Sequence, residues 1–178
     1  MVEMDVQLCK TGEVVLSHDV VHSSGEFVWN MGLDELQRHG IDTLTSFFSA
    51  VYAPGRRVML DVKGRSTGVV AAIFDLLSQH VRAADAANVC IGSFHQAIVA
   101  ELVGRKSAYQ VGLITSSVVC DDPQLSGLDF LSVDLNALFS ETKSEWTCQV
   151  FAYTFRRRVD VEMAERLGID GLISDVLL

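Results

Sequence analysis

The feature that most restricts the fold of this chain is an alternation of short apolar runs with segments of helical periodicity. Seven runs that could form strands lie near residues 3, 60, 90, 112, 131, 151 and 172. Most of the segments between them carry apolar residues three or four positions apart, which indicates amphipathic helices. Nearly continuous apolar strands are typical of parallel sheets that helices cover on both faces. The pattern therefore predicts an α/β fold.

The boundaries of these elements follow from periodicity and from turn residues. We expect strands at Val2–Val6, Val14–Asp19, Arg57–Lys63, Asn88–Ser93, Gln110–Thr115, Asp129–Val133, Gln149–Thr154 and Gly171–Ser174. We expect helices at Leu33–His39, Thr43–Val51, Thr67–His80, His95–Val103 and Val159–Leu167, with a helical turn at Leu135–Phe139. Since no low-complexity segment or linker interrupts this order, residues 1–178 are predicted to form a single domain.

Length and composition further restrict the possible folds and binding partners of the chain. The chain has 178 residues, of which 49% are hydrophobic, so disorder is excluded. A complete (β/α)8 barrel takes about 250 residues and at least about 200, and the seven candidate strands are one short of eight. The net charge of −9 opposes binding to a phosphate backbone, so no nucleic-acid partner is expected.

Cysteine usage and hydropathy indicate the compartment. The four cysteines, Cys9, Cys90, Cys120 and Cys148, are widely spaced and form no CxxC pair. A chain with so large a core does not need disulfides, so reduced thiols are expected. The N-terminal residues do not resemble a signal peptide, and no apolar run is long enough to span a bilayer. These features predict a cytoplasmic protein without a transmembrane segment.

Three short sequences carry the residues that could perform chemistry. Glu3 and Asp5 are two positions apart on a strand and therefore point to the same face. Two carboxylates on one face suit a hard divalent cation, although acids at a solvated strand end are harmless too. Asp61 and Lys63 repeat this spacing, and they could serve as a third metal ligand and a phosphate contact or simply as an ion pair.

The third sequence is His18-Asp19, which follows the second extended run. A histidine there could act as a general acid or base, although a surface or capping histidine is the simpler interpretation. All three sequences lie at or just after the carboxyl ends of the first predicted strands. In parallel α/β proteins, functional residues gather at the carboxyl ends of the strands. Three acids, a histidine and a lysine at one mouth are suited to metal-assisted hydrolysis of a phosphodiester.

At this point the sequence resembles a known family. The stretch Glu3–Asp19 is similar to the signature of the glycerophosphodiester phosphodiesterases, in which E-x-D-V leads through a T-x-D-G turn to V-V-x-H-D. Further stretches agree with the family in the same order: Leu33–Leu36, Ile41–Leu44, Leu60–Lys63, Ser93–His95, Phe151–Phe155 and Gly168–Asp175. The resemblance covers nearly the whole chain, and its first and last segments are the most specific.

The resemblance implies a TIM-barrel-like (β/α)8 fold and the metal-dependent hydrolysis of a glycerophosphodiester to an alcohol and glycerol 3-phosphate. By position, it makes Glu3, Asp5 and Asp61 ligands of Mg²⁺ or Ca²⁺. It makes His18 the catalytic acid or base and Lys63 a substrate contact. Tyr153 stands where the family has an aromatic residue, usually tryptophan, that forms a wall of the substrate pocket.

The chain also departs from the family pattern. The family begins with a strand that ends in His-Arg-Gly, which supplies a second acid/base and a phosphate-binding arginine, and no such sequence occurs in this chain. We therefore expect an incomplete barrel that lacks its first βα unit and has about seven barrel strands. Activity is expected to be weak or lost, because a positioned acid/base contributes about 10²–10⁴-fold to a rate.

Two alternatives remain open at this stage. A truncated or degenerate family member could bind a phospho-ligand or a protein without turnover, and exposed barrel edges beside Val2–Val6 and Gly171–Ser174 could lead to self-association. The chain could also be a different phosphate-binding barrel that uses the segment Gly168–Asp175, since barrels often bind phosphate through their last loops.

Overall fold

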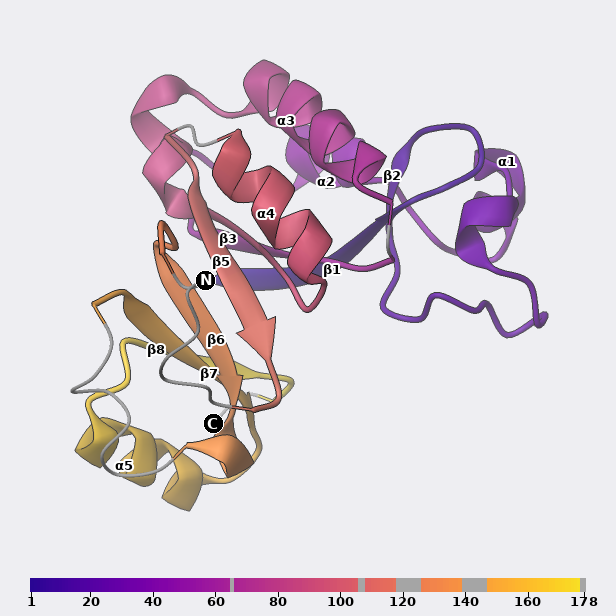
Figure 1. Cartoon of the computed structure of the whole chain (residues 1–178). Coiled ribbons are helices and arrows are strands. Elements are labelled where there is room, and N and C mark those ends of the chain that lie inside the picture. The colour runs from indigo at the N-terminus through magenta and orange to yellow at the C-terminus, as the bar shows by residue number, and fades with distance from the viewer. Residues whose placement is uncertain (65, 106–107, 118–125, 139–146, 177–178) are drawn as a thin grey trace. The chain divides into compact units, whose positions relative to one another are not determined.

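The computed structural model describes residues 1–64, 66–105, 108–117, 126–138 and 147–176 (Figure 1). The chain divides into two compact units, residues 1–110 and 111–178. In the part of the chain that the structure describes, no helix is long and apolar enough to cross a membrane.

The first unit is built on three parallel strands. They are β1 (Val2–Leu8), β3 (Val58–Val62) and β4 (Val89–Ser93), and β3 lies between the other two. All the residues of β3 and β4 are buried, as the apolar runs predict for strands covered on both faces. A short strand, β2 (Val14–Leu16), pairs antiparallel with the last three residues of β1.

Helices complete the first unit. Helices α2 (Leu44–Ala50), α3 (Gly68–His80) and α4 (Gln96–Gly104) lie side by side over the parallel strands, and α3 buries an apolar stripe at helical spacing. The segment between β2 and α2 holds a 3-10 turn, η1 (Val28–Asn30), and the helix α1 (Leu33–Arg38). A second 3-10 helix, η2 (Ala83–Asn88), leads into β4.

The second unit repeats the parallel arrangement. Strands β5 (Gln110–Thr115), β6 (Phe130–Asp134), β7 (Gln149–Phe155) and β8 (Gly171–Ser174) pair in that order, all parallel. The 3-10 turn η4 (Leu135–Ala137) follows β6, and the helix α5 (Arg158–Leu167) connects β7 to β8. The core of this unit joins apolar residues of β6, β7 and α5: Leu131, Val133, Ala152, Phe155 and Ala164.

Two glycines permit the close packing of aromatic rings in the second unit. A Cβ on Gly112 would lie 2.5 Å from the Phe130 ring, and one on Gly171 would lie 2.7 Å from the Phe151 ring. The two rings themselves pack at a centroid distance of 5.3 Å. Residues without a side chain are therefore required at both positions.

Most of the predicted elements are confirmed, with ends that differ by one or two residues. The largest difference is at β2, which ends at Leu16 and not at Asp19, three residues early. Strand β1 continues to Leu8 instead of ending at Val6, because its last residues pair with β2. Helix α2 begins after Thr43, whose hydroxyl accepts a hydrogen bond from the Ser46 backbone N–H. The turns η1 and η2 were not predicted, since neither segment shows an apolar repeat.

Cys9 and Cys148 have free thiols, and the Cys90 thiol donates to Gln110 Oε1 at 3.1 Å. Cys120 and Phe139, which the predictions also named, lie outside the described residues.

Candidate active site

Strand pairing in the first unit brings three carboxylates together. The register of β1 and β3 places Asp5 beside Asp61, and Glu3 lies two residues before Asp5 on the same face. One oxygen from each of the three side chains lies within 4.8 Å of the others. Asp61 is 6% exposed, and Glu3 and Asp5 are half-buried. This convergence confirms that the two spacings found in the sequence share one face.

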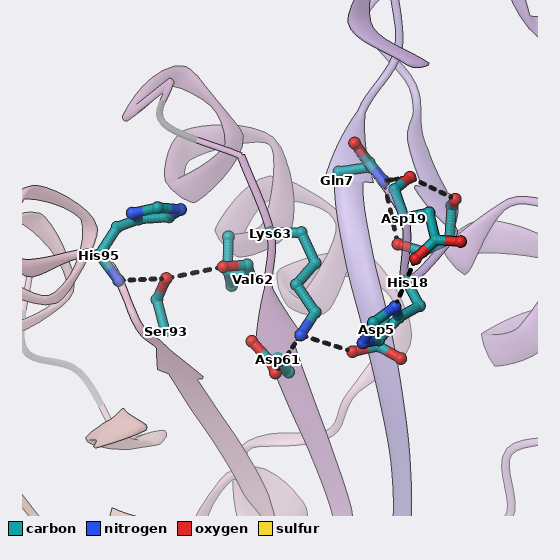
Figure 2. A network of polar contacts seen from close by, with 10 residues as sticks. Asp5, Gln7, His18, Asp19, Asp61, Val62, Lys63, Ser93 and His95 are labelled. Carbon is teal, nitrogen blue, oxygen red and sulfur yellow. Dashed lines mark hydrogen bonds and ion pairs between the residues drawn. The ribbon is translucent and has the colours of Figure 1, made fainter. Parts of the chain in front are cut away.

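Lys63 is the cation that the structure places against these acids. Its Nζ lies 2.6 Å from Asp61 Oδ2 and 3.0 Å from Asp5 Oδ1 (Figure 2). The backbone N–H of Lys63 donates to the Val6 carbonyl at 2.8 Å, which fixes the start of the side chain at the end of β3. The Phe94 ring lies 5.3 Å from Nζ and adds a cation–π contact.

The crowding of three acids around one lysine perturbs their protonation. Desolvation, together with the charges of Asp5 and Asp61, raises the pKa of Glu3 from 4.5 to about 7. Desolvation also raises the pKa of Asp61, although the hydrogen bond and charge of Lys63 oppose this. For Lys63, desolvation opposes the charged form, but Asp61 and then Asp5 outweigh it and raise the pKa. The three acids therefore carry more negative charge than Lys63 balances.

The residues present fit a hard divalent cation. The donor set is three carboxylates, which are the ligands that Mg²⁺ and Ca²⁺ prefer. In addition, Asp61 Oδ1 is buried and has no hydrogen-bond partner among the described residues. A buried carboxylate oxygen without a partner is costly unless a ligand satisfies it. A bound cation would satisfy this oxygen and reduce the repulsion that raises the pKa of Glu3.

His18 stands beside the acids on the segment that follows β2. Its Nδ1 lies 2.8 Å from Asp19 Oδ1, so the ring is oriented by a carboxylate, and 72% of its side chain is exposed. Gln7 holds this segment in place, because its Nε2 donates to the carbonyls of Ser17 at 3.0 Å and Asp19 at 2.9 Å. An exposed, carboxylate-oriented imidazole can take up or release a proton at its other nitrogen.

One detail of the predicted placement is wrong. Glu3 and Asp5 were expected at the carboxyl end of their strand, but they lie in its first five residues, because β1 continues to Leu8. Asp61 does lie near the end of β3, as predicted. Convergence of the acids therefore depends on the register of β1 against β3 and not on the strand ends alone.

Tyr153 belongs to the second unit. It lies on β7, is half-buried, and its hydroxyl donates to the Thr115 carbonyl at 2.8 Å. The ring is thus anchored within the unit, and its contact with a substrate stays a prediction.

Sequence reasoning did not assign roles to three residues near Lys63. Phe94 contacts the lysine, while Gln7 and His95 line a cavity beside it. His95 is positioned by Ser93, whose hydroxyl donates to the Val62 carbonyl at 2.6 Å and accepts from the His95 backbone N–H at 3.1 Å. Phe94 and His95 directly follow the carboxyl end of β4, and that position was the available signal.

Comparison with known proteins decides the family. The model of the glycerophosphoryl diester phosphodiesterase family matches residues 1–177. The chain belongs to this family. Comparison with curated protein sequences finds no significant match.

Several solved structures of low sequence identity share the fold of this chain. A phosphodiesterase from Oleispira antarctica, solved with the product sn-glycerol-3-phosphate, is 18% identical with a TM-score of 0.84, and the match covers 97% of this chain and 80% of that one. Glycerophosphodiester phosphodiesterases from Parabacteroides distasonis (16% identity, TM-score 0.81) and Thermotoga maritima (19%, 0.70) match over the same 97%, and over 78% and 80% of their own chains.

These likenesses confirm the predicted fold class. The chain has the α/β, TIM-barrel-like fold of the family. The described residues supply three parallel strands in the first unit, with β2 as an antiparallel addition, and four parallel strands in the second.

Proposed function

We propose that this chain hydrolyses glycerophosphodiesters to an alcohol and glycerol 3-phosphate, with the help of a divalent cation, Mg²⁺ or Ca²⁺. The observation that carries the proposal is the convergence of Glu3, Asp5 and Asp61 on one face, with a buried Asp61 oxygen that lacks a partner. The family match and an exposed, carboxylate-oriented His18 nearby support it.

Each residue has a role that its position supports. Glu3, Asp5 and Asp61 would hold the cation, which when bound polarises the phosphoryl group and neutralises developing charge. Lys63 is the point charge for a phosphate oxygen. Tyr153, by its place in the family pattern, would contribute an aromatic wall to the substrate pocket.

His18 is the proton carrier. In the overall reaction, water supplies a hydroxyl group to phosphorus, the bond from phosphorus to the alcohol oxygen breaks, and the alcohol oxygen gains a proton. His18 either accepts the proton of the water or protonates the leaving oxygen. Asp19 orients the ring through Nδ1 and leaves Nε2 for this transfer.

The rate of the 178-residue chain is expected to be low. It contains no His-Arg-Gly sequence, so it offers one positioned proton carrier of the two in the family pattern and lacks that arginine for the phosphate. Loss of one acid/base reduces a rate by about 10²–10⁴-fold. This absence also favours a second candidate function, in which the site binds a phospho-ligand without turnover.

The deciding experiment measures release of glycerol 3-phosphate from glycerophosphocholine with Mg²⁺, with Ca²⁺ and with a chelator. We expect release that requires a metal and that is lost when Glu3→Ala and Asp5→Ala are combined. Release that survives both substitutions would contradict the metal site. Binding of glycerol 3-phosphate without any release would favour the non-catalytic function.

A further inference from the structure

A cavity of about 640 Å³ opens beside Lys63 in the first unit. Lys63 lines this cavity and also contacts Asp5 and Asp61, so the cavity begins where the phosphate of a substrate would lie. The rest of its wall comes from the end of β1 and the residues just after it, from the segment that follows β2, from the residues after β3 and the start of α3, and from His95 after β4. The cavity is therefore placed to receive one of the two groups esterified to that phosphate.

The wall of the cavity is largely apolar. Its apolar side chains are Leu8, Cys9, Val20, Trp29 and Val69. Cys9 and Val69 are almost fully buried, at 3% and 1% exposure, whereas Trp29 is 43% exposed and leads from the cavity to the surface. An apolar wall of this size favours a ligand group with a hydrocarbon part, because burying that hydrocarbon in the cavity removes it from water.

The apolar surface continues outside the cavity. The Phe27 ring stacks on Trp29 at a centroid distance of 4.3 Å, and Val21 forms a backbone bridge to Phe27. Phe27 and Val21 are each 42% exposed, and together with Trp29 they form a contiguous exposed apolar patch of the kind that marks a binding surface. A hydrocarbon chain that is longer than the cavity could thus continue onto a surface of the same kind.

The charges on the cavity wall argue against a cationic headgroup. Lys10 and Lys63 line it with His95, and none of the described lining residues is an aspartate or glutamate. Because Lys63 is already paired with Asp5 and Asp61, Lys10 is the cation in this wall that would repel choline or ethanolamine, and no carboxylate among the described lining residues balances it. A neutral group would not be repelled in this way.

One polar group in the wall lacks a partner. Gln7 is 1% exposed, and its Oε1 has no hydrogen-bond partner among the described residues. Figure 2 shows this oxygen turned away from the carbonyls of Ser17 and Asp19, which accept from Nε2 of the same amide. Because only the NH₂ group can donate to two carbonyls, the amide cannot flip, and its oxygen is a fixed, buried acceptor on a residue that lines the cavity.

We propose that this cavity selects diesters in which the group beside the phosphate is neutral and carries a hydrocarbon chain, with a hydroxyl that donates to Gln7 Oε1. The proposal rests on the proposed function, and it names the substrate class of that site: a glycerophosphodiester of a long-chain 1,2-diol or of a monoacyl or monoalkyl glycerol. Gln7 is then a specificity-determining residue.

Binding can be tested without turnover. Calorimetric titration in chelator with glycerol 3-phosphate esters of ethanol, 1-butanol and 1-octanol keeps the phosphate constant and varies only the chain. We expect affinity to rise about two- to fourfold for each of the first added methylenes. Equal affinity for the three esters, or tighter binding of glycerophosphocholine than of the octyl ester, would overturn the proposal.

Two further measurements locate the contacts. Trp29→Ala should weaken the octyl ester about tenfold, while Val51→Ala, which removes an exposed apolar side chain at the end of α2, should not. The 2-hydroxyoctyl ester should bind at least as tightly as the octyl ester, because its hydroxyl meets Gln7 Oε1. A loss of tenfold or more on adding the hydroxyl would show that no acceptor receives it, and would contradict the role of Gln7.

The result of this binding test is independent of the result of the release assay for the proposed function. If the chain releases no glycerol 3-phosphate from the octyl ester in the presence of metal but affinity still rises with chain length, the catalytic proposal fails and the selectivity of the cavity stands. If release occurs but affinity does not depend on the chain, the catalytic proposal stands and the cavity does not select a hydrocarbon.

Discussion

Acidic residues are placed differently in the two units of this chain. In the second unit each of five aspartates has hydrogen-bond donors of its own. Asp134 accepts from Asn136, Asp160 from Arg157, and Asp175 from Arg156, while Asp129 and Asp170 accept from the backbone N–H groups of Val111 and Val150. In the first unit, Glu3, Asp5 and Asp61 converge on the single ammonium of Lys63.

The pKa values follow this difference. The hydrogen bond from Arg157 lowers the pKa of Asp160, and that from Arg156 lowers the pKa of Asp175. Desolvation instead raises the pKa of Glu3 to about 7 and also raises that of Asp61. Acids that each have their own hydrogen-bond donors stabilise loops and helix ends. Acids that are crowded together and have too few donors are suited to bind a cation from solution.

The largest effect is expected from removing a crowded acid. Asp61→Asn should reduce metal-dependent release of glycerol 3-phosphate by on the order of 10³-fold, since a bound cation contributes several kcal/mol of charge stabilisation. The matched control is Asp134→Asn at the end of β6, which keeps an acceptor oxygen for Asn136 and should change the rate less than twofold. Equal losses in the two variants would remove the distinction between the units.

The next effect concerns the proton carrier. His18→Ala should lower the rate by about 10²-fold while the affinity for metal is unchanged, because the imidazole is not part of the carboxylate cluster. Asp19→Asn, which keeps an oxygen near Nδ1, should cost less. Steady-state rates and calorimetric metal titrations on both variants check this, and a rate that does not change in His18→Ala would contradict the assigned role.

Much of the site could be predicted from the sequence because it depends on local rules. The two-residue spacing of Glu3 with Asp5 and of Asp61 with Lys63 fixes which side chains share a face. The cavity could not be predicted, since its wall joins residues that tertiary packing brings together, such as Leu8, Trp29 and Val69. The extension of β1 to Leu8 likewise depends on its pairing with β2.

The second unit should be sensitive to the packing of its aromatic rings. Gly112→Ala should lower the free energy of unfolding by about 1–3 kcal/mol, because the added methyl group would meet the Phe130 ring. Gly104→Ala at the end of α4, where a Cβ meets nothing within 4 Å, is the control and should not destabilise the chain. Urea denaturation measures both, and metal affinity should be the same in the two variants.

The smallest effect is a dependence of stability on pH. Glu3 has an ordinary pKa of 4.5 and a folded pKa of about 7, so between these values the folded chain binds more protons than the unfolded one. Its contribution to stability is therefore highest below pH 4.5 and falls as the pH rises toward 7. Partial contact of the side chain with water reduces the size of this effect.

Glu3→Gln should remove this decrease in stability with rising pH. Melting temperatures measured in chelator between pH 4.5 and 8 check this. Asp160→Asn should leave the shape of the profile in this range unchanged, because the folded pKa of Asp160 is lowered from 3.8, so its contribution to stability is lost only on acidification below that value. If Glu3→Gln melted with the same pH profile as the unaltered chain, the crowding of the acids would be contradicted.

Calorimetric titration of Ca²⁺ and of Mg²⁺ into the chelator-treated chain tests the central claim most directly, since it needs no substrate and no turnover. We predict one cation per chain for at least one of the two metals, with affinity lost in Asp61→Asn and retained in Asp134→Asn. Absence of binding for both metals, or binding that Asp61→Asn leaves unchanged, would contradict a cation site built from Glu3, Asp5 and Asp61.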